Sequence, residues 1–282
     1  MRIGATLDTF GGSVELAEKL AEEGCLIEVL VRRRTKESQF MRDLSEKGQL
    51  RLHGAWWTKF GRRHFYGKDP LKTAIFDVMM GPWENNPAAH LAQKYRAPVV
   101  LHHGVVLELL ARNELNRQTG SLLKPEVEND NYLTYPWSGK SKFSDYVDCM
   151  GAVIRARRQN SRFGHVLDIG HLAETNWKVG EEVFEDCLKK ALDYCIRAEI
   201  TVVSAHLSGY DPEGFREHLF LRDGAIDVGA CVKLLVAHNS AINLIVESPS
   251  VSYRGSIERR KRPQPWFDKT CDDIKWLQDV AS

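Results

Sequence analysis

Four residues able to bind a metal ion follow apolar runs at widely separated points of this sequence. They are Glu128 after PEV, Asp168 after HVL, His206 after VVSA and Glu247 after INLIV. Such runs are typical of buried parallel strands, so each polar residue should lie at the carboxyl end of a strand. A carboxylate in that position is costly unless it is paired or bound to metal. Oxygen and imidazole ligands without cysteine predict a catalytic site for Zn²⁺, Mn²⁺, Mg²⁺ or Co²⁺.

Further histidines extend this metal chemistry. His53, His102 and His103 also follow apolar runs, His171 comes three residues after Asp168, and His218 comes twelve residues after His206. Taken singly, each is more often a hydrogen-bonded loop residue than a ligand. Together with Glu128 they could form a second metal site, whereas His171 could instead orient a ligand or contact substrate. The sequence is thus compatible with one or two bound ions.

Short apolar segments recur along the chain and are predicted to be strands. They cover residues 3–7, 26–31, 50–55, 98–101, 125–128, 165–169, 200–205 and 241–246. Stretches with a helical period are predicted at residues 13–24, 143–159, 181–196, 227–239 and 267–281. This alternation, without a low-complexity linker, predicts one closed (β/α)₈ barrel domain over residues 1–282. In such a barrel, catalytic groups gather at the carboxyl ends of the strands.

Two stretches, residues 58–97 and 104–124, fit this alternation poorly. The first contains GRRHFYGKDP and GPWENNP, whose glycine, proline and asparagine content is typical of loops. We expect both stretches to be extended loops on the catalytic face, where they could form a lid or a substrate wall. A surface insertion without a catalytic role is the alternative.

Composition bounds the partners and the compartment. The 39 basic and 38 acidic side chains give a net charge of +1, so no global charge attracts nucleic acid or a membrane surface. No apolar run reaches the roughly 18 residues needed to cross a bilayer, and the first residues do not resemble a secretory signal. The cysteines form no CxxC pair and are expected to be reduced core residues of a cytoplasmic protein. They are Cys25, Cys149, Cys187, Cys195, Cys231 and Cys271.

In the order of these residues, the chain resembles the xylose isomerase-like TIM-barrel superfamily, which includes sugar phosphate isomerases and epimerases and endonuclease IV. The resemblance runs from RIGATLDTFGG to IVESPS. In the ketose epimerase branch, it implies that one ion is held by Glu128, Asp168, His206 and Glu247. The two glutamates would exchange a proton with the substrate carbon between them. A further glutamate and an arginine of that branch are replaced here by Thr134 and Pro212.

The endonuclease IV branch, in which three zinc ions cleave DNA at abasic sites, accounts for more of the histidines. There the resemblance implies zinc ligands at His53, at His102 or His103, at His171 and at His218. It also matches Arg32, Arg33, Arg34, Trp56 and Trp57 to the place where that family inserts an arginine and an aromatic into DNA. The aspartate expected two residues before His218 is Arg216 here, which argues against a trinuclear site.

Three hypotheses about function follow. The leading one is a metal-dependent isomerase or epimerase of a small sugar or sugar phosphate, with Glu128 and Glu247 as acid and base. The second is an endonuclease IV-like, zinc-dependent phosphodiesterase acting on abasic-site DNA. The third is a non-catalytic relative that binds a ligand. With a small substrate, residues 32–34 and 59–63 could bind a phosphate or form a solvated basic face, and residues 56–57 could line a sugar ring or form part of a lid. A homo-oligomer is compatible with any of these.

Overall fold

The fold is a closed barrel of parallel strands, seen in a computed structural model that describes residues 1–31, 35–54, 88–111, 113, 115–120, 122–129, 146–213, 216–247 and 258–282. The strands follow the order β1-β10-β7-β6-β5-β4-β3-β2 around the barrel, which confirms the predicted fold class. They are β1 (Arg2–Thr6), β2 (Leu26–Val31), β3 (Leu50–Gly54), β4 (Val99–His102), β5 (Pro125–Glu128), β6 (Gly164–Asp168), β7 (Val202–Leu207) and β10 (Asn243–Val246).

Two parts of the chain are each compact. Residues 1–29 together with 165–282 are called the first unit here, and residues 30–164 the second unit. The expectation that residues 1–282 form one domain stays a prediction.

Strand pairing in the first unit sets the register that positions polar side chains. β1 pairs with β2 and with β10, β10 pairs with β7, and β7 pairs with β6, always in parallel. In this register Asp168 is the partner of His206. Val246, the residue before Glu247, is the partner of Leu207, the residue after His206. The register therefore brings the carboxyl ends of β6, β7 and β10 to one level.

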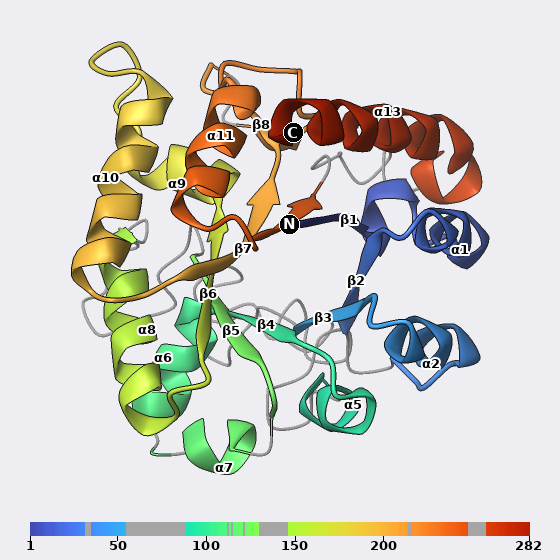
Figure 1. Ribbon diagram of the computed structural model, residues 1–282, viewed down its shortest axis with the longest axis horizontal. Helices are drawn as coiled ribbons and strands as arrows, with labels where there is room; N and C mark the ends of the chain where they lie inside the picture. Colours follow the sequence, from blue (N-terminus) through green and yellow to red (C-terminus); the bar gives the residue numbers. More distant parts are fainter. Residues whose placement is uncertain are drawn as a thin grey trace, which may run out of the picture. The chain divides into compact units, whose positions relative to one another are not determined.

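The helices of the first unit largely follow the sequence-based expectation. They are η1 (Leu7–Phe10), α1 (Val14–Glu22), α9 (Ile169–Asn176), α10 (Phe184–Arg197), α11 (Val228–His238) and α13 (Gln264–Ala281). Ser13 caps α1, as its position before the helical pattern predicted, and its hydroxyl accepts a hydrogen bond from the backbone N–H of Leu16. Helix α13 packs against η1, α1 and α11 (Figure 1). Helix α9 was not predicted, because it begins directly at the end of β6.

A small hairpin lies between β7 and α11 in the first unit. Strands β8 (Gly209–Asp211) and β9 (Arg216–Leu219) pair antiparallel. The sequence did not predict them, since strands of three or four residues give too short a pattern to recognise. Gly209 is needed there, because an added Cβ would lie 2.0 Å from the carbonyl oxygen of Asp223. Strand β9 carries His218, one of the candidate ligands.

The second unit contains β3, β4 and β5, which pair in that order and in parallel. Its described helices are α2 (Gln39–Glu46), α5 (Ala88–Tyr95), α6 (His103–Ala111), α7 (Leu115–Thr119) and α8 (Tyr146–Gln159). Helices α6 and α8 lie side by side (Figure 1). Helix α8 confirms the helix expected over residues 143–159.

One expectation about the second unit is wrong. Residues 104–124 were expected to be a long loop, but most of them form α6 and α7. The apolar residues of α6 recur on every side of the helix, so the segment lacks the amphipathic period by which a surface helix is recognised. Residues 88–95 of the other expected loop form α5, whose Leu91, Ala92 and Tyr95 are buried at helical spacing. Residues 58–87 lie outside the described residues.

The cysteines and the helices bear on the expected compartment. None of the six cysteines forms a disulfide, and all but Cys271 are buried. Burial raises the pKa of the Cys25 and Cys271 thiols to about 11, and it raises the pKa of Cys231 further. Within the described part of the chain, every helix is too short or too polar to cross a membrane. The cytoplasmic location stays a prediction.

Candidate metal centre

In the first unit, three of the predicted ligands converge. Asp168 ends β6, His206 lies on β7 and Glu247 directly follows β10. The Nδ1 atom of His206 lies 2.8 Å from Oε2 of Glu247 and 4.0 Å from Oδ2 of Asp168. The potential ligand atoms of all three lie within 4.8 Å of one another. We call these residues the carboxylate-rich cluster.

Burial differs within the carboxylate-rich cluster. The side chain of Asp168 is 1% exposed and that of His206 is fully buried, whereas that of Glu247 is 22% exposed. The carboxylates of Asp168 and Glu247 lie within 4.8 Å of each other, and two negative charges at that distance are costly unless a cation or a proton balances them. Two carboxylates and an imidazole are also the donor types that bind divalent metals, so the donor set fits the predicted ion. Glu247 is the member that a substrate can reach.

A fourth residue of the first unit, Glu28 on β2, was missed by the sequence reasoning. Its carboxylate oxygens lie 3.1 and 3.3 Å from Nε2 of His206, whereas Glu247 lies beside the other ring nitrogen, Nδ1. Glu28 is fully buried. It escaped notice because it stands inside the apolar run LIEVLV instead of after it. The usable signal was a carboxylate in the middle of a buried strand, where a polar residue must have a partner.

His171 and His218 join Asp168 in a second group of the first unit. The carboxylate of Asp168 caps α9 by accepting a hydrogen bond from the backbone N–H of His171, at 2.7 Å. The rings of His171 and His218 lie edge to face, with centroids 5.3 Å apart. His218 has a φ of 57°, a left-handed conformation that residues other than glycine adopt rarely. Ligand atoms of the three lie within 4.8 Å of one another.

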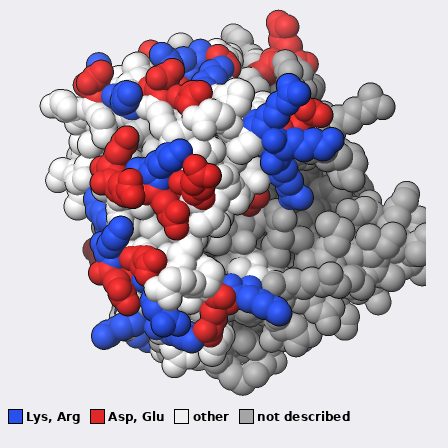
Figure 2. Space-filling model, turned by 90° about the vertical axis from the view of Figure 1, so that its right-hand side faces the viewer, with Lys and Arg blue, Asp and Glu red and all other residues white. Residues whose placement is uncertain are grey.

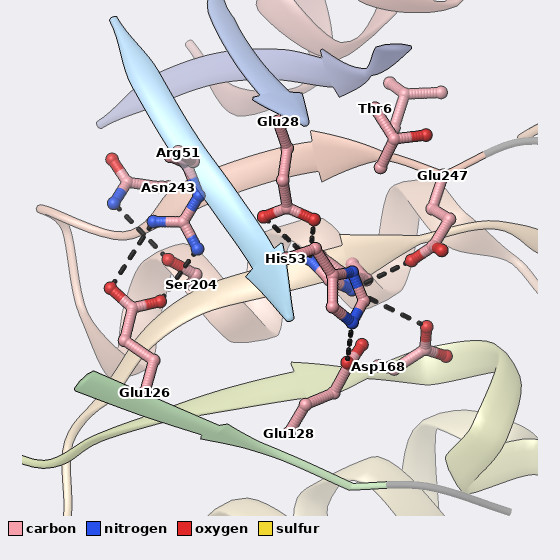
Figure 3. Close-up of polar contacts among 12 residues, drawn as sticks. Thr6, Glu28, Arg51, His53, Glu126, Glu128, Asp168, Ser204, Asn243 and Glu247 are labelled. Atoms are coloured by element: carbon pink, nitrogen blue, oxygen red, sulfur yellow. Dashed lines mark hydrogen bonds and ion pairs between the residues drawn. The ribbon is translucent and has the colours of Figure 1, made fainter. Parts of the chain in front are cut away.

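In the second unit, His53, His102 and Glu128 form what we call the histidine-rich cluster. The Nε2 atoms of the two histidines lie 2.9 Å apart, and each lies 3.1 Å from Oε2 of Glu128. Figure 3 shows His53 and Glu128 pointing toward each other from β3 and β5. All three are buried. Two imidazole nitrogens and a carboxylate oxygen converging in this way suit Zn²⁺ and similar ions.

The two neighbouring histidines lie in different elements of the second unit. His102 ends β4 and is the strand partner of Glu128, so it turns toward the cluster. His103 begins α6 and, among the described residues, belongs to no group of potential ligands. The change from strand to helix between these neighbours gives their side chains different surroundings. His102 as the ligand stays a prediction.

Residues two or four positions before the cluster residues, earlier in the same strands, differ between the units. In the second unit, Arg51 and Glu126 form a buried ion pair with a shortest N···O distance of 2.7 Å (Figure 3). In the first unit, the amide of Asn243 donates to the hydroxyl of Ser204 at 3.4 Å. A charged pair thus precedes the histidine-rich cluster along its strands, and neutral groups precede the carboxylate-rich cluster along its strands.

Some predicted residues lie outside the described part of the chain. They are Arg32, Arg33, Arg34, Trp56 and Trp57, together with the basic residues at 59–63. Glu128 lies in the second unit, whereas Asp168, His206 and Glu247 lie in the first. A single ion held by all four remains a prediction.

Charged side chains on one face of the molecule are mixed in sign. On the face in Figure 2, Lys and Arg side chains of the described residues are interspersed with Asp and Glu side chains. This agrees with the near-neutral composition. A mixed surface gives little long-range attraction for a polyanion.

Comparisons with known proteins identify the architecture. No protein-family model matches the sequence, and no curated protein matches it. Among solved structures, a D-psicose 3-epimerase determined in the presence of D-fructose has a TM-score of 0.61 at 12% identity, covering 100% of this chain and 99% of that one. A xylose isomerase domain protein from Planctomyces limnophilus has a TM-score of 0.57 at 11% identity, covering 99% and 95%.

The chain has the xylose isomerase-like TIM-barrel fold. Endonuclease IV from Thermus thermophilus shares it too, with a TM-score of 0.55 at 17% identity over 95% of this chain and 100% of that one. Because enzymes of different activity share this fold, the likeness establishes architecture and leaves the reaction to the residues of the site.

Proposed function

We propose that the protein is a divalent-metal-dependent enzyme that isomerises or epimerises a small sugar or sugar phosphate. The observation that carries the proposal is the carboxylate-rich cluster, buried at the carboxyl ends of β6, β7 and β10. Asp168, His206 and Glu247 would hold the ion, with Glu128 as the fourth ligand implied by the sequence. The likeness to D-psicose 3-epimerase in fold is consistent with this assignment.

The proposed reaction needs residues that bind the metal ion and residues that transfer a proton. A bound divalent ion supplies Lewis acidity toward vicinal carbonyl and hydroxyl oxygens of a sugar. Glu247 is partly exposed, so a substrate could reach it, and its Oε2 lies 2.8 Å from Nδ1 of His206. It would take the proton from the carbon beside the carbonyl. Glu128 would return a proton to that carbon or its neighbour. Asp168 would hold the ion.

Deuterium uptake tests this proposal without requiring the natural substrate. The protein, loaded with Mn²⁺, Co²⁺, Mg²⁺ or Zn²⁺, is incubated in D₂O with a panel of ketoses, aldoses and their phosphates, and proton NMR detects exchange at the carbon beside the carbonyl. We expect exchange with at least one member, and a loss of about 10²–10⁴-fold in rate for Glu247→Gln. Asp223→Asn, which changes an exposed carboxylate paired with Lys269, is the control and should exchange normally. Full activity of Glu247→Gln would refute the proposed role.

A second candidate function, an endonuclease IV-like phosphodiesterase, is favoured by different observations. The histidine-rich cluster and the group of Asp168, His171 and His218 provide the imidazole ligands that multi-zinc hydrolysis needs. Its test is incision of a duplex containing one abasic site, with zinc supplied. Activity lost in His53→Ala but kept in His90→Ala, an exposed histidine of the same unit paired with Glu37, would establish the hydrolase. An intact duplex in every condition would exclude it.

A further inference from the structure

Glu28 has a defined place beside the carboxylate-rich cluster but no place in the proposed chemistry. It lies on β2 and is fully buried, and its carboxylate meets the far nitrogen of the His206 ring. A buried carboxylate is expensive, so its retention inside an apolar strand calls for a physical role.

The geometry separates the two nitrogens of His206. Nε2 faces both carboxylate oxygens of Glu28, at 3.1 and 3.3 Å. Nδ1 faces Glu247 at 2.8 Å and Asp168 at 4.0 Å. An imidazole binds metal through a nitrogen that carries no hydrogen, and the partner of the other nitrogen decides which one that is.

We propose that Glu28 is a positioning residue that holds hydrogen on Nε2 of His206 and so reserves Nδ1 for the metal. This inference rests on the proposed metal site of Asp168, His206 and Glu247. Because Glu28 anchors one end of the ring, the imidazole cannot rotate away from the ligand position. The carboxylate charge also increases the basicity of Nδ1, which strengthens a bond from that atom to a cation.

Nitrogen-15 NMR of the histidine side chains tests this inference directly. In wild type, both metal-free and loaded with Zn²⁺, we expect hydrogen on Nε2 of His206, with slow exchange against solvent. In Glu28→Leu, which removes the acceptor, that hydrogen should exchange rapidly or move to Nδ1. Glu28→Gln has nearly the same shape, so it keeps the protein folded and tests the charge alone. A metal-free wild type with hydrogen on Nδ1 and none on Nε2 would overturn the inference.

Zn²⁺ and Mn²⁺ titrations by calorimetry give a second readout. We expect the affinity to fall about 10–100-fold in Glu28→Gln and Glu28→Leu, the range usual for the outer hydrogen-bond partners of metal ligands. Asp273→Asn is the matched control, since Asp273 is a fully buried carboxylate of the same unit that accepts hydrogen bonds from the backbone N–H of Leu221 and from Arg222. Its affinity should equal that of wild type. Equal affinities for both Glu28 variants and Asp273→Asn would contradict a positioning role.

The outcomes separate this inference from the proposed function. If the Glu28 variants lose affinity and the Nε2 hydrogen while no sugar exchanges deuterium, the isomerase proposal fails and the role of Glu28 stands. If wild type exchanges deuterium but the Glu28 variants bind metal normally, the role of Glu28 fails and the isomerase proposal stands.

Discussion

Each unit has a cluster of potential metal ligands at the carboxyl ends of its parallel strands, but the two clusters differ in their ligand types. The carboxylate-rich cluster of the first unit has one imidazole among acidic groups, and the residues before it are the neutral pair Ser204 and Asn243. The histidine-rich cluster of the second unit has one carboxylate between two imidazoles, and before it lies the ion pair of Arg51 and Glu126. Oxygen-rich sites favour Mg²⁺ and Mn²⁺, and nitrogen-rich sites favour Zn²⁺.

This difference bears on how strongly each cluster depends on a metal ion. A cluster with excess negative charge needs a cation to be stable, whereas two neutral imidazoles and a carboxylate can satisfy one another by hydrogen bonds. The carboxylate-rich cluster should therefore depend more on its metal. The buried pair of Arg51 and Glu126, in contrast, balances its own charge without a metal ion.

The largest expected effect comes from breaking the buried ion pair. Arg51→Met leaves the carboxylate of Glu126 buried without its partner, which should lower the free energy of unfolding by about 3–5 kcal/mol. The double variant Arg51→Met with Glu126→Leu should recover most of this loss, because no charge remains buried. Urea denaturation of the three proteins measures both effects. A double variant no more stable than Arg51→Met would mean that the pair contributes more than charge balance.

Ligand removal sharpens the comparison between the clusters. Asp168→Ala should weaken binding of Mn²⁺ by at least about 100-fold, since even outer partners of metal ligands commonly contribute 10–100-fold. His53→Ala should leave Mn²⁺ binding unchanged and weaken only binding of Zn²⁺. Elemental analysis of protein purified without chelators, followed by calorimetric titration, distinguishes the sites. Loss of both metals in both variants would show that the clusters are not independent.

A smaller effect is expected for the neutral pair. Ser204→Ala removes one long hydrogen bond with the amide of Asn243, which should lower the free energy of unfolding by about 0.5–1.5 kcal/mol. The same urea experiment as for Arg51→Met measures it. If Ser204→Ala lowered the free energy of unfolding as much as Arg51→Met does, the charged pair and the neutral pair would not differ in their effect on stability.

The smallest effect concerns pH and lies away from both clusters. Burial lowers the pKa of His238 below its ordinary 6.5, and its Nε2 accepts a hydrogen bond from the backbone N–H of Val202. The unfolded chain therefore binds a proton at a higher pH than the folded chain does. Stability from this group is complete above pH 6.5 and is lost as the pH falls through 6.5 toward the folded pKa. Thermal unfolding of His238→Gln between about pH 5 and 7 should show a slightly shallower decline than wild type.

The sequence predicted the barrel because most strands are short, largely apolar runs and several helices have a clear amphipathic face. Helix α10 illustrates this, with Phe184, Leu188 and Leu192 buried at helical spacing. Helix α6 was missed because an apolar residue on every side leaves no period to detect. The sequence thus predicted the helices that bury only one face and the strands that are short apolar runs.

The candidate site was predictable where a polar residue ends a strand. Asp168, His206 and Glu247 are such residues, and the structure brings them together. Glu28 was not predictable in this way, because its role depends on a neighbour 178 positions away in the sequence. The choice of His102 over His103 likewise required the strand register, which sequence periodicity leaves uncertain by one residue.

Because most of its cysteines are buried, the chain should react slowly with thiol reagents. Cys271 is the one cysteine that is not buried, and with a pKa of about 11 only about one in ten thousand of its thiols is ionised at pH 7. A cysteine introduced at an exposed position would react far faster. Ile196→Cys on α10, at 61% exposure, and Val147→Cys on α8, at 51%, would place one spectroscopic label on each unit. A distance between such labels could then be followed in solution, without first removing the native cysteines.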